Sequence, residues 1–383
     1  MLLLEEKGLV FDGSLGCFQE RISFFTTLCV LDSGTVLCGF QNGPKKHDVS
    51  STIKICRSTD HGKTWRNIDK IFETLVDGVP GSLSTAEMVE VFPGRILLFA
   101  TWFDRSEPNR PLFDPLTEGI LKSKQLVCVS QDEGLTWSEW SKVSTGDLKG
   151  CSFTGPVIKW KNGVIAVPFE SYKEFDDTAD KMHGAWLLIS SDGGHTFSKP
   201  LLVAQHPRHE IYYWDQRLCK GRNDGEFFAF FWTHHLRQKC DLPVHFLKGM
   251  VSGSSLFCGP VQQTSMPGQI ATPCLLPNGH LVAFVVDRNK PGTLTLWLSS
   301  DGGQSWPLNN RLVVHTHDEQ ALLSQGVADI DFKQYWEDMA KWSFGHPALC
   351  NVSNGKILLA WYAGSPDCMS IHWARICTKG IAI

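Results

Sequence analysis

The sequence predicts an all-β protein, a six-bladed β-propeller that forms one domain over residues 1–383. Three observations carry this prediction. Six hairpin-like segments recur along the chain, their spacing is regular, and four of the six units end in nearly the same polar turn. Length alone would suggest two or three domains, but repeated sheets can share one large assembly. The repeats therefore decide the fold class.

Each hairpin-like segment consists of two apolar runs, rich in β-branched and aromatic residues, that are joined by a glycine turn. Such runs around SG, PG, NG or DG pairs are typical of β-hairpins. A third apolar run follows most of them, so the unit is three or four antiparallel strands, which pack radially when repeated six times. The turn glycines recur about every 55–75 residues, at Gly34, Gly94, Gly163, Gly225, Gly279 and Gly355.

A polar turn follows the third run in four units, and we call these segments the boxed turns. They are STDHGKTW (58–65), SQDEGLTW (130–137), SSDGGHTF (190–197) and SSDGGQSW (299–306). In such a turn Asp accepts hydrogen bonds from backbone and hydroxyl groups, glycine takes a positive φ, and the aromatic residue packs between sheets. We expect structural staples between the third and fourth strands rather than calcium or sugar sites. The fourth unit keeps the shape without the Asp, and the sixth has no boxed turn.

Composition limits the class of partner and the compartment. Hydrophobic residues make up 42% and charged residues 20%, which favours a packed core. The net charge of −4 and scattered basic residues favour neither nucleic acid nor an anionic membrane as partner. The 13 cysteines, without a CxxC pair, are expected to be free thiols in a reducing compartment. The leading MLLLEEKG is too short for a signal-peptide core, so a cytoplasmic location is expected, with a mature domain lacking its leader as the alternative.

Together the hairpins and boxed turns resemble the sialidase superfamily, six-bladed propellers with Asp-box turns of the pattern S-x-D-x-G-x-T-W. The resemblance covers nearly the whole chain. TGPVIKWKNGVIAVP (154–168) is similar to the family's third blade, GTLTLWLSSDGGQSW (292–306) to its fifth and GHPALCNVSNGKILLAWY (345–362) to its sixth. The resemblance implies a glycan-active enzyme that needs no cofactor or metal.

In such a propeller the hairpin turns and boxed turns lie on one face. The starts of the inner strands and the ends of the second strands lie on the other face, around a central funnel where functional residues gather. The segments expected there are rich in Arg, His, Asp and Glu, and comprise 18–23, 42–52, 103–110, 170–180, 209–217, 233–239, 286–292 and 343–348.

The resemblance also implies roles for single residues. Sialidases hold the substrate carboxylate with three arginines, because guanidinium groups bind a planar anion in a bidentate manner. Here the three are expected to be Arg21, Arg217 and Arg288, although Arg21 is about three residues too far from the hairpin glycine and Arg237 could replace Arg217. Further substrate-binding candidates on the same face are Arg105, His234 and His235.

Catalytic residues follow from the same resemblance. Asp48, ten residues before the first boxed turn, corresponds to the family's acid/base Asp. The family's Glu that activates a nucleophilic Tyr falls near Asp215, with Glu210 as an alternative. The Tyr itself is expected about nine residues before Gly355, where this chain has His346.

His346 is therefore the sharpest departure from the family pattern. A histidine can act as a general acid or base, or as a neutral hydrogen-bond donor, but it cannot replace a phenol directly. A metal site is disfavoured because His234 and His235 are neighbours on a strand and point to opposite sides. The tyrosines that could reach the funnel from elsewhere are Tyr212, Tyr213, Tyr335 and Tyr362.

The function expected is a sialidase-like glycoside hydrolase that acts on an acidic sugar by a non-standard mechanism. Two alternatives stay open: a polysaccharide lyase on uronic-acid glycans, with a histidine as the base, and a non-catalytic propeller that binds carbohydrate or protein. The expected partner is an acidic sugar or glycan, and the oligomeric state is left open. Segment 324–343 carries Phe332, Trp336 and Met339 at helical spacing, which predicts a short helix against the funnel rim.

Overall fold

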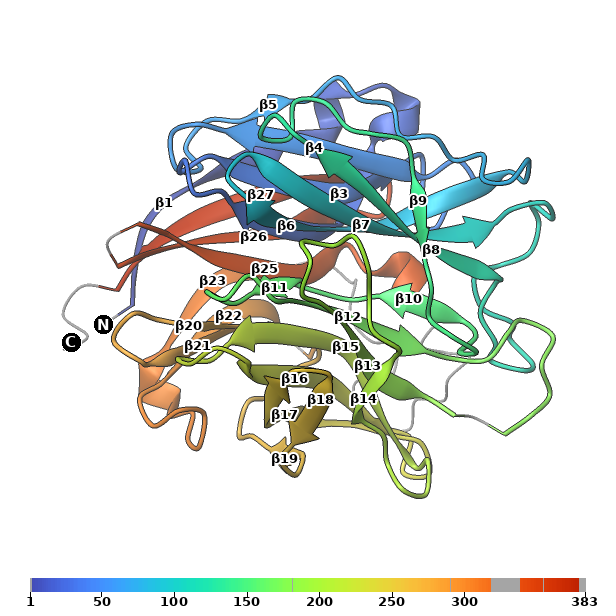
Figure 1. Ribbon diagram of the computed structural model, residues 1–383. Coiled ribbons are helices and arrows are strands. Elements are labelled where there is room, and N and C mark those ends of the chain that lie inside the picture. Colours follow the sequence, from blue (N-terminus) through green and yellow to red (C-terminus); the bar gives the residue numbers. More distant parts are fainter. Residues whose placement is uncertain (1, 181, 290, 318–337, 354, 379–383) are drawn as a thin grey trace.

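The computed structural model describes residues 2–180, 182–289, 291–317, 338–353 and 355–378. Over these residues the chain forms the predicted six-bladed β-propeller, and we number the blades in chain order (Figure 1). The inner strands are β2 (Ile22–Val30), β6 (Gly81–Phe92), β10 (Cys151–Phe153), β15 (Ile211–Lys220), β20 (Ala271–Leu275) and β25 (Phe344–Ser353). The second strands are β3 (Val36–Gly43), β7 (Arg95–Asp104), β12 (Ile165–Ser171), β16 (Glu226–His235), β21 (Leu281–Asp287) and β26 (Lys356–Ser365).

Two further strands complete each blade. The third strands are β4 (Thr52–Ser58), β8 (Ser123–Ser130), β13 (Gly184–Ser190), β17 (Cys240–Ser252), β22 (Gly292–Ser299) and β27 (Cys368–Cys377). The outer strands are β5 (Arg66–Asn67), β9 (Ser141–Val143), β14 (Leu201–Ala204), β18 (Ser255–Cys258), β23 (Arg311–His317) and β1 (Leu3–Phe11). The remaining short elements are β11 (Ile158–Lys159), β19 (Gln262–Gln263) and the 3-10 turns η1 (Gly13–Leu15), η2 (Phe18–Glu20) and η3 (Leu308–Asn310).

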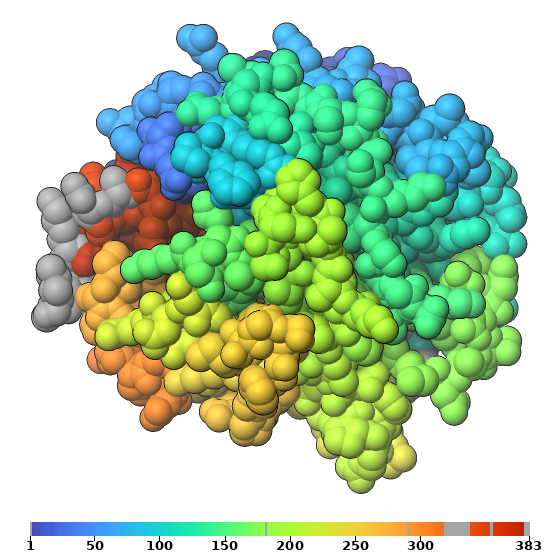
Figure 2. Space-filling model, viewed as in Figure 1, coloured from blue at the N-terminus to red at the C-terminus, as the bar shows by residue number. Residues whose placement is uncertain are grey.

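The ring is closed by the first strand of the chain. Strand β1 pairs antiparallel with β27 and becomes the outer strand of blade six, so the blue and red segments lie side by side in Figures 1 and 2. A parallel contact between Ile22 and Met369 joins this blade to blade one. These two pairings close the ring where the last blade meets the first.

The six hairpin turns are confirmed. Every predicted turn glycine has a positive φ, between 75° and 85°, which glycine adopts without a steric penalty. Apolar strand residues are buried between neighbouring blades, and all 13 cysteines are free. No described helix is long and apolar enough to cross a membrane.

The boxed turns join the third strand to the fourth, as predicted. In blade one Asp60 accepts hydrogen bonds from the Ser58 hydroxyl (2.8 Å), the Thr64 amide (2.9 Å) and the Thr64 hydroxyl (2.7 Å). Trp65 donates its indole N–H to the carbonyl of Gly62, whose φ is 85°. The same carboxylate bonds recur at Asp132, Asp192 and Asp301.

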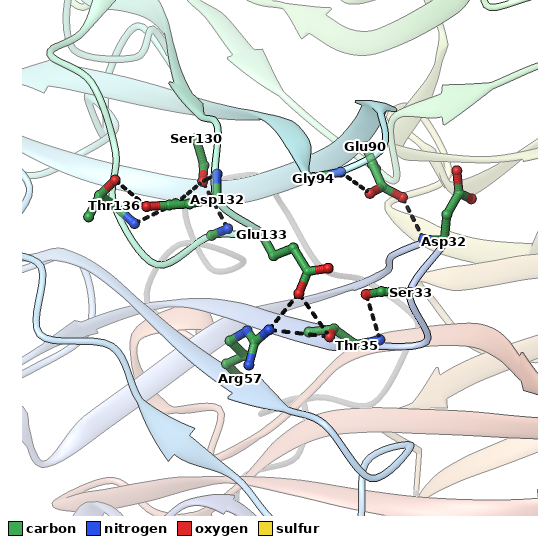
Figure 3. Close-up of polar contacts among 11 residues, drawn as sticks. Asp32, Ser33, Thr35, Arg57, Glu90, Gly94, Ser130, Asp132, Glu133 and Thr136 are labelled. Atoms are coloured by element: carbon green, nitrogen blue, oxygen red, sulfur yellow. Dashed lines mark hydrogen bonds and ion pairs between the residues drawn. The ribbon is translucent and has the colours of Figure 1, made fainter.

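One boxed turn also links two blades. Figure 3 shows Glu133, next to Asp132 in blade two, reaching Arg57 and Thr35 in blade one. The Glu133 carboxylate lies 2.6 Å from the Arg57 guanidinium, and its amide donates to the carbonyl of Gly94. Polar contacts thus join blades one and two on the boxed-turn face.

The predicted helix over 324–343 lies mostly outside the described residues, which include only its end. Residues 338–341 are helical, and Met339 and Trp342 lie at the funnel face.

Candidate functional site

Inner strands of four blades carry the same β-bulge on the funnel face, among the described residues. At each bulge two residues of the inner strand oppose one residue of the second strand, which turns a side chain out of the ladder. The first bulged residue has a positive φ of 49–60°, and these residues are Phe25, Thr85, Asp215 and His346. Such backbone is costly for residues other than glycine, above all for a bulky or β-branched side chain, and it gathers at functional sites.

The bulges surround a cavity of about 980 Å³, mouth included. Its lining comes from the starts of inner strands and the ends of second strands, as the propeller geometry predicted. The cavity-lining residues with ionisable side chains are Lys46, His47, Glu170, Tyr172, Asp215, Arg217, Arg288, His346 and Tyr362.

A buried ion pair lies next to the cavity. Arg217, on β15, lies 3.7 Å from the carboxylate of Glu87, on β6, and Glu87 accepts a hydrogen bond of 3.0 Å from Thr27. Gly155 permits this packing, because a Cβ there would lie 2.0 Å from the Glu87 carboxyl carbon. Burial raises the pKa of Glu87 to about 7, although Arg217 opposes the shift.

Two carboxyl groups with different environments line one wall of the cavity. Asp215 lies 2.5 Å from the Arg217 guanidinium, and the Asp215 amide donates a hydrogen bond of 3.2 Å to Glu170. Burial, together with the nearby charge of Asp215, raises the pKa of Glu170 to about 8. Glu170 is therefore mostly protonated at neutral pH, beside a carboxylate that an arginine stabilises.

His346 fixes the orientation of Arg217. Its Nδ1 lies 3.1 Å from the carbonyl of Thr26, which can only accept, so Nδ1 carries the proton. Nε2 then accepts from Arg217 Nη2. Burial and the charge of Arg217 hold the pKa of His346 well below its usual range, so the ring is neutral. With both nitrogens engaged, His346 acts through Arg217 in this arrangement.

Another part of the cavity wall is basic. Arg288, which is 2% exposed, donates from Nη2 to the carbonyl of Phe344 (3.1 Å), while its Nε and Nη1 atoms have no partner among the described residues. Lys46 donates to the hydroxyl of Tyr362 and to the carbonyl of Met339, both at 3.1 Å. A Cβ on Gly345 would lie 2.2 Å from Arg288 Nη2, so glycine makes room for the guanidinium there.

The charges of this wall change the acidity of Tyr362. Burial opposes ionisation of the phenol, but the positive charges of Lys46 and Arg288 outweigh it and lower the pKa of Tyr362. Burial also lowers the pKa of Lys46. Aromatic rings complete the cavity: Trp342 stacks below Arg288, with 4.0 Å between the guanidinium carbon and the ring centroid, and Trp214 and Trp232 lie on the side of blade four.

A second depression, which we call the rim hollow, adjoins the cavity. It has a volume of about 1010 Å³, mouth included, and is lined by residues 45–49, Arg105, residues 108–113, Met339 and Ala340. Asp48 lies here, accepting hydrogen bonds from the Ser50 amide (2.9 Å) and hydroxyl (2.7 Å). Burial opposes ionisation of Asp48, but these bonds and Lys45 lower its pKa.

The structure thus brings together some of the predicted site residues and separates others. Asp215, Arg217, Arg288 and His346 share the cavity, whereas Asp48 and Arg105 lie in the rim hollow. The residues that line neither are Arg21, His234, His235, Glu210, Arg237, Tyr212 and Tyr213. Tyr335 lies outside the described residues.

The positions of three of these residues show why they line neither the cavity nor the rim hollow. Arg21 is exposed beside the ring of Phe18, because it precedes β2 and points out of the blade. His234 is buried and stacked on Trp214, 5.3 Å between ring centroids. His235 is the last residue of β16 and is half-buried. These positions do not support the substrate-binding roles expected for the three residues.

Sequence reasoning missed Glu87, and it included Glu170 and Lys46 only within longer polar segments, without a role for either. Glu170 stands near the end of β12, a strand that is otherwise mostly apolar, where an ionisable side chain is costly to bury. That placement was the signal that could have found Glu170. No group of three or more His, Cys, Asp or Glu side chains among the described residues is arranged to hold a metal ion.

Comparison with solved structures shows the same fold in several proteins. A protein of unknown function from Dyadobacter fermentans is 17% identical, with a TM-score of 0.71 and 98% of both chains covered. A Hadza microbial sialidase is 16% identical (TM-score 0.69; 95% of this chain and 67% of that chain). An α-L-arabinanase from Penicillium chrysogenum, solved with arabinobiose, is 14% identical (TM-score 0.67; 100% of both chains).

No protein-family model matches the sequence, and neither does any curated protein. At such low identities the structural likeness establishes the propeller fold alone.

Proposed function

We propose that this propeller is a glycoside hydrolase that acts on an acidic sugar. Two of the similar structures are described as a sialidase and an arabinanase, both of which act on sugars. The observation that carries the proposal is the pairing of Glu170 with Asp215 in a cavity that Arg288 and Lys46 also line.

The basic wall supports an anionic substrate. Arg288 is buried and Lys46 is half-buried, and neither has a carboxylate in ion-pair contact among the described residues, although a shielded charge without a counterion is costly. Nε and Nη1 of Arg288 can donate to two oxygens of one carboxylate. A sugar carboxylate bound there would supply the missing charge.

The two carboxyl groups support general acid and base chemistry. Glycosidases commonly use one carboxylic acid to protonate the leaving oxygen and one carboxylate to activate water or to attack the anomeric carbon. The raised pKa of Glu170 suits the acid, and Asp215, held by Arg217, suits the carboxylate. In this proposal His346 is a positioning residue that orients Arg217.

A panel of umbelliferyl glycosides tests the proposal. We expect release of the fluorophore from glycosides of sialic or uronic acids but not from neutral sugars, and a rate that falls as pH rises through about 8, where Glu170 loses its proton. Asp215→Asn should lose turnover, whereas the control Asp224→Asn, which changes an exposed residue in the hairpin turn of the same blade, should keep it. Absence of turnover with every acidic glycoside would reject the proposal.

Tyr362 favours one second candidate, a lyase on uronic-acid glycans. The phenol lies between Lys46 and Arg288, where an ionised form is stabilised, so it could take the proton α to a carboxylate that Arg288 neutralises. The leaving oxygen would depart from the β position and a carbon–carbon double bond would form. That product absorbs in the near ultraviolet, and hydrolysis cannot produce this signal.

A further inference from the structure

The rim hollow holds positive charge that its own carboxylate does not neutralise. Lys45 faces Asp48 at 3.7 Å, and Arg110 is paired at 2.8 Å and 3.0 Å with two carboxylates that do not line the hollow. Lys46 and Arg105 have no carboxylate within 4.0 Å among the described residues, although both line the hollow, where Arg105 is almost fully buried and Lys46 is half-buried. The hollow is therefore suited to an anionic group.

Arg105 is fixed in place before any ligand arrives. It is 5% exposed, donating from Nε to the hydroxyl of Ser82 (2.8 Å) and from Nη2 to the carbonyl of His47 (3.1 Å). His47 has a φ of 54°, which places that carbonyl toward the guanidinium. Nη1 makes no hydrogen bond to the described residues, so it is free to donate to a ligand in the hollow.

The hollow continues the cavity, because both are lined by Lys46, His47, Leu112, Phe113 and Met339. A glycan bound with one sugar in the cavity would thus place the neighbouring sugar in the hollow. Pro108 and Pro111 add to an apolar surface there, against which the face of a sugar ring can pack.

We propose that the rim hollow binds the leaving-group sugar, and that Arg105 receives a carboxylate or sulfate carried by that sugar. The inference rests on the proposed function, since a leaving group presupposes cleavage in the cavity. It deepens that function by defining the substrate as a glycan with acidic groups on two neighbouring sugars, one held by Arg288 and one by Arg105.

Matched disaccharides test this inference. Each carries the same acidic sugar on the cavity side and a neutral hexose, a hexuronic acid or a sulfated hexose as the leaving group. We expect kcat/KM to be roughly tenfold higher or more with the two anionic leaving groups, because a charge-assisted bond to arginine is strong. The uronic and sulfated arms show which anion the hollow prefers. Arg105→Gln should abolish most of this ratio.

Two further sets of variants separate binding from folding. Arg95→Gln removes a cation from the opposite end of β7, outside the hollow, and should change the ratio less than threefold. Asn109 is exposed on the hollow, so Asn109→Asp should lower the ratio and Asn109→Lys should raise it, without disturbing buried contacts. These variants keep the test valid even if Arg105→Gln fails to fold.

A ratio near one in the native protein, or one that neither Arg105→Gln nor the Asn109 variants change, overturns the inference. If no acidic glycoside is cleaved, the proposed hydrolase fails by itself. Calorimetric titration with the same disaccharides then tests the hollow separately. If the doubly acidic disaccharides bind more tightly than the neutral one, and Arg105→Gln abolishes this difference, the inference is supported. Equal affinities reject it.

Discussion

Asp132 on the boxed-turn face and Glu170 on the cavity face are carboxyl groups in opposite environments. On the boxed-turn face Asp132 accepts hydrogen bonds of 2.5–2.8 Å from Ser130 and Thr136, and although burial opposes ionisation, these bonds lower its pKa. On the cavity face burial and Asp215 raise the pKa of Glu170 to about 8. A carboxylate whose acceptor sites are filled stabilises a turn, whereas one that is buried with few donors keeps a proton that it can give away.

The largest effect expected from this difference is on catalysis. Glu170→Gln should lower kcat/KM on the best acidic glycoside roughly 10²–10⁴-fold, because the amide cannot protonate the leaving oxygen. Thermal unfolding should show that the variant still folds. An activity within tenfold of the native protein would remove Glu170 from the mechanism and weaken the contrast between the faces.

Arg288 should control selectivity. We expect Arg288→Gln to reduce the preference for acidic over neutral glycosides by about 10–100-fold, since it loses the two unpartnered donors and the charge. Arg311→Gln is a suitable control in the same blade, because Arg311 is exposed and lies against the ring of Trp297. Equal losses on acidic and neutral substrates would indicate a structural role for Arg288.

Substitution on the boxed-turn face should affect stability alone. Asp132→Ala removes the acceptor of Ser130 and Thr136 and should lower the free energy of unfolding by about 1 kcal/mol, as for the loss of a capping side chain. Urea denaturation measures the change, and kcat/KM should stay within twofold. A large loss of activity with unchanged stability would show that the boxed turns have a functional role.

Two trends of stability with pH are expected, and they run in opposite directions. The pKa of Glu170 is raised from 4.5 to about 8, so the folded protein binds more protons there than the unfolded chain and the free energy of unfolding falls across this range. Glu170→Gln removes that loss, so its melting temperature relative to the native protein should rise from about pH 5 to about pH 9. The deficit of Asp132→Ala should instead shrink as pH falls below about 4, because the pKa of Asp132 is lowered and its stabilisation is lost on protonation. Trends of the same sign in both variants would contradict the comparison.

The fold could be predicted from the sequence because its signals are local and repeated. Turn glycines such as Gly34 and boxed aspartates such as Asp60 depend on a few neighbouring residues, and in-phase repetition makes them specific. The face that carries the cavity followed from the same geometry, and Asp215, Arg217, Arg288 and His346, which were chosen from that face, line the cavity.

The rest of the site depends on the bulges and on contacts between blades, which short-range patterns do not reveal. Lys46 enters the cavity through its bond to Tyr362, 316 residues away in the chain. Glu170 was included only as part of a polar segment, because its proton affinity comes from burial and from Asp215 on another blade. Arg21 was misplaced because a shift of a few residues before an inner strand moves a side chain from the funnel to the surface.

The repeated bulges have a consequence for how such a protein can change. Phe25, Thr85, Asp215 and His346 share one backbone shape but carry an aromatic ring, a hydroxyl, a carboxylate and an imidazole. The same bulge therefore presents four different functional groups to the cavity, while the strand ladder on either side of it keeps the same pairing. In this propeller the chemistry at the mouth can differ from blade to blade without a difference in backbone shape.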